Sequence, residues 1–171
     1  MHATVIAFWG RHGWRAALLR GPSGAGKSDL ALRAMAAGGR LVCDDRAVVW
    51  TSGGRLYARS PSTLAGLIEI RGLGVIPVPV PVLPMAQVAL VVDLANAAQD
   101  VERVPAPDWE TIGGARTRRI SLFPLEPSAP AKLAFAVAAA TLGAEAEPAY
   151  QAQSADEAEA PDAESGASQE E

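Results

Sequence analysis

The chain has 171 residues, 49% of them hydrophobic, which suits a single domain with a core of ordinary size. Its formal net charge of −4 is uneven, because residues 144–171 hold nine of the nineteen acids and no Lys or Arg. Residues 1–143 therefore carry a net charge of +5. That value falls well short of the dense cationic stripe of a dedicated nucleic-acid binder, so no nucleic-acid partner is expected.

The cysteine content and the apolar runs predict where the protein resides. Cys43 is the only cysteine, which excludes an intrachain disulfide and fits a reducing compartment. No stretch of about twenty apolar residues is free of Pro, Gly and charge. The N-terminus MHATVIAFWGRHGWR has neither a basic leader nor a small-residue cleavage site. We expect a soluble, cytoplasmic protein with no membrane partner.

The first third of the chain predicts alternating strands and a helix. Residues 3–9 and 16–19 are β-branched or apolar and predict two strands, with RHGWR as a turn between them. Residues 28–37 carry an apolar stripe at helical spacing, and Gly38-Gly39 is a typical helix stop. Residues 41–43 form a short apolar run, as expected of a strand buried on both faces of a sheet.

A β-hairpin is predicted to leave the sheet just beyond this last strand. Residues 47–50 and 56–58 flank Thr51-Ser52-Gly53-Gly54, and glycine tolerates the positive φ that tight turns require. A helix is expected around residues 61–66. Residues 79–84, PVPVLP, carry proline at alternate positions. They can form only an edge strand or an extended crossing.

The second half of the chain predicts fewer regular elements. Residues 85–94 resemble a buried strand, residues 120–125 a further strand, and residues 131–142 an alanine-rich helix. Residues 144–171 have almost nothing to bury and are expected to be a disordered acidic tail. We therefore expect one catalytic domain over residues 1–143 followed by that tail.

The segment GPSGAGKS fits the phosphate-loop pattern G-x-x-x-x-G-K-[ST] at every fixed position and lies between a predicted strand and a predicted helix. Backbone N–H groups of such a loop hold the β-phosphate, Lys27 reaches the β and γ oxygens, and Ser28 binds Mg²⁺. The predicted nucleotide-binding residues are Gly21, Pro22, Ser23, Gly24, Ala25, Gly26, Lys27 and Ser28.

Two apolar strands end in acids that could organise the metal. LVCDD ends at Asp44 and Asp45, and VALVVD ends at Asp93. A single acid at a strand end can equally cap a turn or pair with an arginine such as Arg46. The doubled acid favours LVCDD, since adjacent side chains point in different directions and can divide metal binding from proton transfer.

A third segment, EIRGLGVIPV, places Glu69 and Arg71 on the same face of an extended backbone. Glu69 could face a metal ion, and Arg71 could hold a phosphate. A surface ion pair explains the same spacing, because such pairs are common and contribute little.

The P-loop, GRLVCDD and EIRGLGVIPV together resemble the HPr kinase/phosphorylase family, of which EIRG-x-G is a signature. The resemblance covers residues 1–140 and fits the short, single-domain versions, since other members carry a larger N-terminal domain before this core. It implies an α/β fold with a P-loop kinase core similar to phosphoenolpyruvate carboxykinase, a mixed sheet with flanking helices, and a β-hairpin after the first strand-end acids.

The resemblance also implies roles for particular residues. Ser28 and Glu69 would bind Mg²⁺. The Asp44-Asp45 pair would supply the base for phosphorylation and the acid for the reverse step, with Asp45 favoured. Further catalytic residues implied in this way are Lys27, Arg71, His2 in HATVIAFWG and Arg103 in VERVP.

The implied activity is ATP-dependent phosphorylation of a serine of the phosphocarrier protein HPr, which regulates the phosphotransferase system and carbon metabolism. The reverse step uses inorganic phosphate to attack phosphoserine and gives pyrophosphate. The resemblance further implies a hexamer. In the family segment linked to dephosphorylation this chain has PLEPSAPAK, where only Lys132 matches the expected basic residues, and this departure weakens the phosphorylase prediction more than the kinase prediction.

Two alternative functions stay open. A small-molecule P-loop kinase would need an arginine-rich lid, for which Arg116, Arg118 and Arg119 are candidates. A regulatory module could instead bind ATP without transferring phosphate and engage a partner through its acidic tail. A GTPase is disfavoured, because the chain has no N-K-x-D segment.

Overall fold

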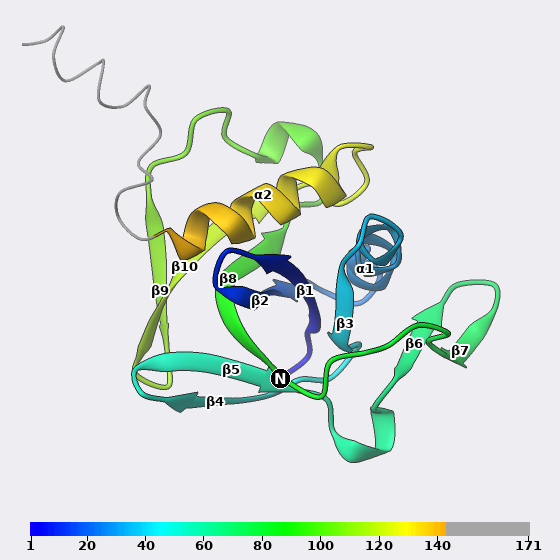
Figure 1. The fold of residues 1–171 in the computed structure, drawn as a ribbon. Coiled ribbons are helices and arrows are strands. Elements are labelled where there is room, and N and C mark those ends of the chain that lie inside the picture. The colour runs from blue at the N-terminus through cyan, green and yellow to red at the C-terminus, as the bar shows by residue number, and fades with distance from the viewer. Residues whose placement is uncertain (143–171) are drawn as a thin grey trace, which may run out of the picture.

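The computed structural model of the chain describes residues 1–142. The predicted tail at 144–171 lies outside the described residues. The main sheet has the strand order β3-β1-β2-β8-β10-β9 (Figure 1). The strands along this path are β1 (Thr4–Gly10), β2 (Gly13–Arg20), β3 (Arg40–Cys43), β8 (Ala86–Leu94), β9 (Asp108–Ile112) and β10 (Ala115–Leu122). A hairpin described below joins the same eight-stranded sheet through β8. The central strands β2, β8 and β10 are parallel, and the flanking pairs are antiparallel. The predicted mixed α/β sheet is therefore confirmed.

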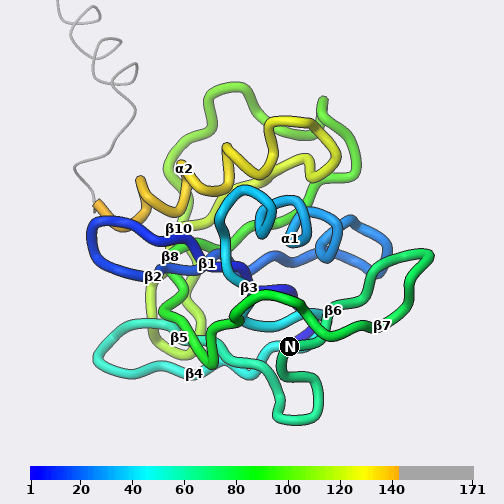
Figure 2. The backbone as a smooth tube through the Cα atoms, turned by 45° about the vertical axis from the view of Figure 1, so that its right-hand side comes forward, coloured from blue at the N-terminus to red at the C-terminus, as the bar shows by residue number. Residues whose placement is uncertain are grey.

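The chain forms three layers, with both helices on one face of the sheet and a hairpin on the other (Figures 1 and 2). The helices are α1 (Lys27–Ala36) and α2 (Ala129–Thr141), and the hairpin is β4 (Val48–Ser52) with β5 (Arg55–Arg59). Side chains of a strand alternate between the faces. In β2, Ala17 and Leu19 face the helices, whereas Ala16 and Leu18 face the hairpin. Two apolar cores thus share one sheet.

The hairpin of β4 and β5 forms where the glycine turn predicts it and packs over one face of the sheet, while β5 stays hydrogen-bonded to the start of β8. Leu56 and Ala58 of β5 pair with the first residues of β8, and both side chains are fully buried. Burial of apolar area at about 25 cal/mol per Å² favours this attachment over a free hairpin. Burial in the same core also raises the pKa of the Cys43 thiol to about 12.

Several predicted boundaries were wrong. The RHGWR turn is only two residues long, because Gly13 already pairs with Gly10. The helix expected around residues 61–66 is a single 3₁₀ turn, Ser62–Leu64, and another such turn covers Ala98–Asp100. The strand expected at 120–125 is β10, which begins five residues earlier at Ala115 and ends at Leu122. Strand β9 was not predicted, since DWETI is polar and shows no apolar alternation.

EIRGLGVIPV forms a separate two-stranded sheet of β6 (Leu67–Ile70) and β7 (Gly74–Pro77). Ile68 of β6 is buried against Ala31 of α1 and Leu41 of β3, which fixes the hairpin beside the first helix. The proline-rich residues 78–85 contain no helix or strand, which agrees with the predicted extended crossing.

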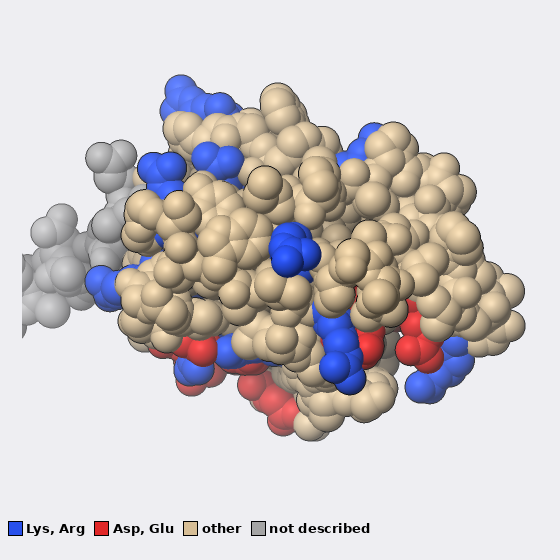
Figure 3. Space-filling model, turned by 90° about the horizontal axis from the view of Figure 1, so that it is seen from below, with Lys and Arg blue, Asp and Glu red and all other residues tan. Residues whose placement is uncertain are grey.

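The described part of the chain contains no helix that is long and apolar enough to span a membrane. On the face seen in Figure 3, Lys and Arg side chains are scattered over largely uncharged surface and do not gather in one stripe.

Charged side chains meet at the carboxyl ends of the central strands. Arg20 donates hydrogen bonds to both carboxylate oxygens of Asp93, at 2.8 and 3.0 Å, and to both of Glu110, at 2.7 Å each. Arg119 lies 2.7 Å from Asp108 and 3.9 Å from Asp93. The hydrogen bond to Glu110, more than any other interaction, raises the pKa of Arg20. Asp93 of β8 therefore links β2 and β10 through these two arginines. Its carboxylate, which the alternative prediction assigned to a metal ion, is paired with Arg20 instead.

The replacement Arg20→Gln is expected to lower the free energy of unfolding by about 1–3 kcal/mol, because two partly buried carboxylates would face each other unpaired. Urea denaturation followed by circular dichroism measures the change. The matched replacement Arg55→Gln removes an arginine that has no carboxylate within 4.0 Å in residues 1–142 and should leave the midpoint almost unchanged. Equal losses in the two variants would contradict the role of the Arg20 cluster.

Candidate functional site

The predicted phosphate loop connects the end of β2 to the start of α1. Gly24 and Gly26 have φ of 81° and 86°, a left-handed conformation that L residues rarely adopt. A Cβ at Gly26 would also lie 3.3 Å from a side-chain carbon of Pro124. The backbone of this chain thus favours glycine at Gly26, a fixed position of the pattern, and at Gly24, a variable one.

Lys27, the first residue of α1, is held by the loop. Its ammonium donates to the carbonyl oxygens of Gly21 at 2.9 Å and Pro22 at 2.8 Å, and the residue is only 6% exposed. Burial lowers the pKa of Lys27, while the nearby carboxylates of Asp45 and Asp44 oppose this shift. The cation therefore lies inside the loop, on the side of the two acids.

Asp44 is buried and accepts three hydrogen bonds. Thr4 and Ser28 donate to its Oδ1 at 2.6 and 2.8 Å, and the backbone N–H of Glu69 donates to its Oδ2 at 3.0 Å. Hydrogen bonds of this number stabilise a charged carboxylate away from water. Asp44 thereby joins β1, the start of α1, the end of β3 and β6.

Asp45 points the other way, into the hollow beside the P-loop. Its φ of 62° is the only positive value at a non-glycine residue in the described chain, and this conformation reverses the direction of the side chain relative to Asp44. His2 Nδ1 lies 3.0 Å from Asp45 Oδ1, and the two side chains are 47% and 50% exposed. Backbone pairing of His2 with Arg46 brings the chain start to this position.

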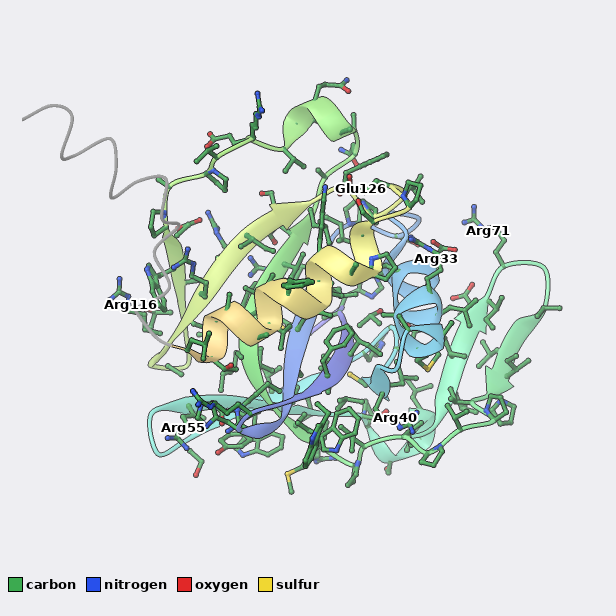
Figure 4. The ribbon with its side chains drawn as sticks, turned by 45° about the horizontal axis from the view of Figure 1, so that its top comes forward. Arg33, Arg40, Arg55, Arg71, Arg116 and Glu126 are labelled. Atoms are coloured by element: carbon green, nitrogen blue, oxygen red, sulfur yellow. The ribbon has the colours of Figure 1, made fainter. Side chains whose placement is uncertain are left out.

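The hollow has a volume of about 410 Å³ and collects most of the predicted residues. Glu69 of β6 and Arg71, on the turn after β6, both line it. Figure 4 shows Arg71 beside the β6–β7 hairpin. The predicted residues that line it are His2, Ser23, Gly24, Gly26, Lys27, Ser28, Asp45, Glu69 and Arg71. Asp44 lies behind them, buried under Ser28 and Glu69.

Arg103 is not among the residues that line this hollow. It is exposed in the loop between the Ala98–Asp100 turn and β9. Of the eight predicted nucleotide-binding residues, Gly21, Pro22 and Ala25 are not among those that line the hollow. The carbonyl oxygens of Gly21 and Pro22 accept hydrogen bonds from Lys27.

The donor set fits Mg²⁺ only together with a phosphate. Within residues 1–142, no three His, Cys, Asp or Glu side chains converge as a metal site. Mg²⁺ typically binds one or two protein oxygens plus substrate phosphates and waters. Ser28 donates its hydroxyl hydrogen to Asp44, which leaves the Ser28 oxygen lone pairs free to face a cation. Glu69 lines the same hollow.

Sequence patterns missed some residues of this region. Thr4, fully buried in β1, contacts Asp44 from forty residues away, and no local pattern signals that role. Three apolar residues also line the hollow, namely Leu32, Ile70 and Leu125.

The fold and this site define a class: a mixed α/β protein with a glycine-rich loop before its first helix and carboxylates beside that loop. The HPr Serine kinase C-terminal domain family matches residues 1–152. The chain belongs to that family.

Individual relatives agree with the assignment. The HPr kinase/phosphorylase of Limosilactobacillus reuteri is 35% identical over 114 residues, which cover 61% of this chain and 36% of that protein. That of Clostridium tetani is 45% identical over 62 residues, 36% of this chain and 20% of the relative. The matches thus span about a third or less of these relatives. The structure of the Hpr(Ser) kinase/phosphatase from Coxiella burnetii aligns with a TM-score of 0.70 and 25% identity, over 85% of this chain and 97% of the other.

Thr4→Val is expected to destabilise the fold by about 1–3 kcal/mol, because a buried charged carboxylate loses one donor. Weaker Mg-ATP binding should accompany the loss, since Ser28 shares the same Asp44 oxygen. Urea denaturation and calorimetric titration measure the two effects. Thr4→Ser keeps the hydroxyl and should restore nucleotide affinity, and a Ser variant as weak in binding as the Val variant would show that packing, not the hydrogen bond, matters.

Proposed function

We propose that this chain transfers the γ-phosphoryl group of ATP to a serine of an HPr-type phosphocarrier protein. Membership of the family and the names of its relatives support this activity and substrate. The observation that carries the proposal is the position of Asp45, whose carboxylate lines the same hollow as the P-loop while Asp44 is committed to three hydrogen bonds. One acid is thus available for proton transfer.

In the forward step the serine hydroxyl oxygen attacks the γ-phosphorus of ATP. The Asp45 carboxylate takes the hydroxyl proton, and the bond from the γ-phosphorus to the β–γ bridging oxygen breaks, which releases ADP. His2, 3.0 Å from Asp45, fixes the orientation of the base. Lys27 and Arg71 carry the positive charge that faces the transferred phosphoryl oxygens.

Ser28 and Glu69 would hold Mg²⁺, and the bound ion supplies positive charge that neutralises the β and γ oxygens of the nucleotide. Ser28 is oriented for this by its hydrogen bond to Asp44. Arg103 stays a candidate from the family resemblance, and its exposure suits contact with a protein substrate.

In the reverse step an oxygen of inorganic phosphate attacks the phosphorus of phosphoserine. The bond to the serine oxygen breaks, Asp45 returns the proton to that oxygen, and pyrophosphate forms. Lys132 is the one basic residue that matches the family segment for this step, but its ammonium donates to both Glu126 oxygens at 2.7 Å. This ion pair makes Lys132 less available for the reverse step. We therefore expect phosphorylation to be faster than phosphorolysis.

The assembly and setting of the protein follow from the resemblance alone. We propose a cytoplasmic hexamer with a phosphoenolpyruvate carboxykinase-like core that regulates the phosphotransferase system. Exposed apolar side chains suit contacts between copies, including Trp9 at 70% and Phe135 at 79% exposure.

The two alternatives receive less support. Arg116, Arg118 and Arg119 belong to β10, and none of them lines the P-loop hollow, so these three do not form the arginine lid that a small-molecule kinase would need. A module that senses ATP without transfer would not need Asp45 in the hollow, beside Lys27.

Incubation with ATP, Mg²⁺ and HPr from the same organism is expected to label one serine of HPr. Asp45→Asn should lower the labelling rate by about 100-fold or more, the usual contribution of a general base, while ATP binding stays measurable. Mass spectrometry of HPr and calorimetric titration with ATP measure the two quantities.

The exposed acid Asp108 provides a control, because it pairs with Arg119 outside the hollow. Asp108→Asn should retain labelling. Tight ATP binding by the unmodified chain with no labelled serine would support the sensing module instead, and parallel loss of ATP binding and labelling in Asp45→Asn would make Asp45 a nucleotide-binding residue.

Pyrophosphate formation from phosphoserine-HPr and phosphate is expected to be slower than ATP-dependent labelling. Glu126→Gln should raise its rate, because the neutral side chain no longer holds the Lys132 ammonium. A coupled pyrophosphate assay measures the change, with Glu102→Gln as an exposed control. No increase in the Glu126 variant would separate Lys132 from the reverse reaction.

A further inference from the structure

A second hollow, of about 360 Å³, lies at the end of the molecule away from the P-loop. We call it the arginine hollow. Figure 4 shows two of its residues, Arg55 and Arg116, beside the last turn of α2 and far from Arg71. The hollow is bounded by the turn of the first hairpin, the turn between β4 and β5, the start of β10 and the end of α2. Its charged and aromatic lining residues are His12, Arg15, Arg55, Trp109, Arg116 and Arg118.

The charged residues that line the hollow are all basic. A carboxylate outside the lining, that of Asp108, interacts with Arg118 at longer range. None of the residues that line the hollow is Asp or Glu. Within residues 1–142, its four arginines have no carboxylate within 4.0 Å, whereas Arg20, Arg33 and Arg119 elsewhere all do. Like charges this close repel one another, so the arrangement favours an anionic occupant.

Two of the arginines are held in place by an aromatic ring. The guanidinium carbons of Arg116 and Arg118 lie 4.6 and 5.4 Å from the centre of the Trp109 ring. Stacking of this kind orients the planar guanidinium while its N–H groups stay available to carboxylates. The ring therefore lowers the entropic cost of binding an anion here.

The chain itself supplies anions at this rim. Thr141, the last residue of α2, lines the arginine hollow. The sequence then runs through residues 144–171, with nine acids and no Lys or Arg. An extended chain covers about 3.3–3.6 Å per residue, so Glu145 reaches about 13 Å from Thr141, and every later acid has a longer tether.

We propose that the acidic segment 144–171 binds the arginine hollow of the same chain. A tethered ligand has an effective concentration in the millimolar range, which lets several weak arginine–carboxylate pairs act together. The interaction occupies cations that an acidic partner or a nucleic acid would otherwise contact. It does not rest on the proposed kinase activity, because the arginine hollow and the P-loop hollow share no lining residue.

A nitroxide label on Ser154→Cys in the full-length chain tests the proposal by paramagnetic broadening in ¹⁵N spectra. The single native thiol, Cys43, is 1% exposed with its pKa raised to about 12 by burial, so labelling is selective for the new cysteine. The amides of Arg55, Arg116 and Arg118 should be broadened. The broadening should be lost in about 1 M NaCl, where the Debye length is about 3 Å.

Two sets of substitutions separate specific binding from general attraction. Arg116→Gln with Arg118→Gln should remove the broadening, whereas Arg40→Gln with Arg59→Gln, an equal change of charge away from the hollow, should retain it. Replacement of Asp156, Glu157 and Glu159 by Asn and Gln leaves residues 1–142 untouched and should also remove it.

Broadening that neither the hollow arginines nor the tail acids affect would overturn the proposal. So would binding of a single-stranded oligonucleotide to the hollow with no broadening from the label, since the occupant would then be a nucleic acid. The paramagnetic broadening reports proximity and does not depend on phosphate transfer. A chain that is inactive on HPr could therefore still show binding of the acidic segment to the arginine hollow.

Discussion

The buried carboxylate of Asp44 is the contact on which the site depends. Its three donors come from Thr4, Ser28 and the backbone of Glu69, which lie forty, sixteen and twenty-five residues away along the chain. A buried charge is costly unless fully hydrogen-bonded, so these donors cannot move independently. The relative positions of the phosphate loop, the first strand and the EIRG hairpin are therefore set by one group.

The backbone at Asp45 completes this arrangement. A left-handed conformation costs an L residue about 1–2 kcal/mol, although Asp tolerates it better than most residues. Here it lets two consecutive acids point in opposite directions. Asp44 is 4% exposed, whereas the Asp45 side chain is half exposed in the hollow. The local cost is offset by the hydrogen bonds that Asp44 makes.

Sequence patterns identified the elements whose signals are local. The phosphate loop, α1 and the β4–β5 turn follow from motif, periodicity and glycine placement. Strand β9 was not predicted because its own sequence shows no apolar alternation. It forms a strand because residues such as Trp109 pair with β10, which no local pattern reveals. The Thr4 contact and the Arg20 cluster could not be predicted either, since both depend on how distant strands align in the sheet. The family resemblance, not spacing, pointed to His2.

Helix α2 runs from the P-loop side of the molecule to the arginine hollow. Its N-terminal end lies on the P-loop side, where Leu125 lines the site and Arg33 donates to the carbonyls of Pro124 and Glu126. Its C-terminal end lies at the arginine hollow. A helix carries partial positive charge at its N-terminus and partial negative charge at its C-terminus. The N-terminus that lines the P-loop hollow is that of α1, whose first residue is Lys27, whereas the C-terminus of α2 partly offsets the repulsion among the arginines at the other hollow.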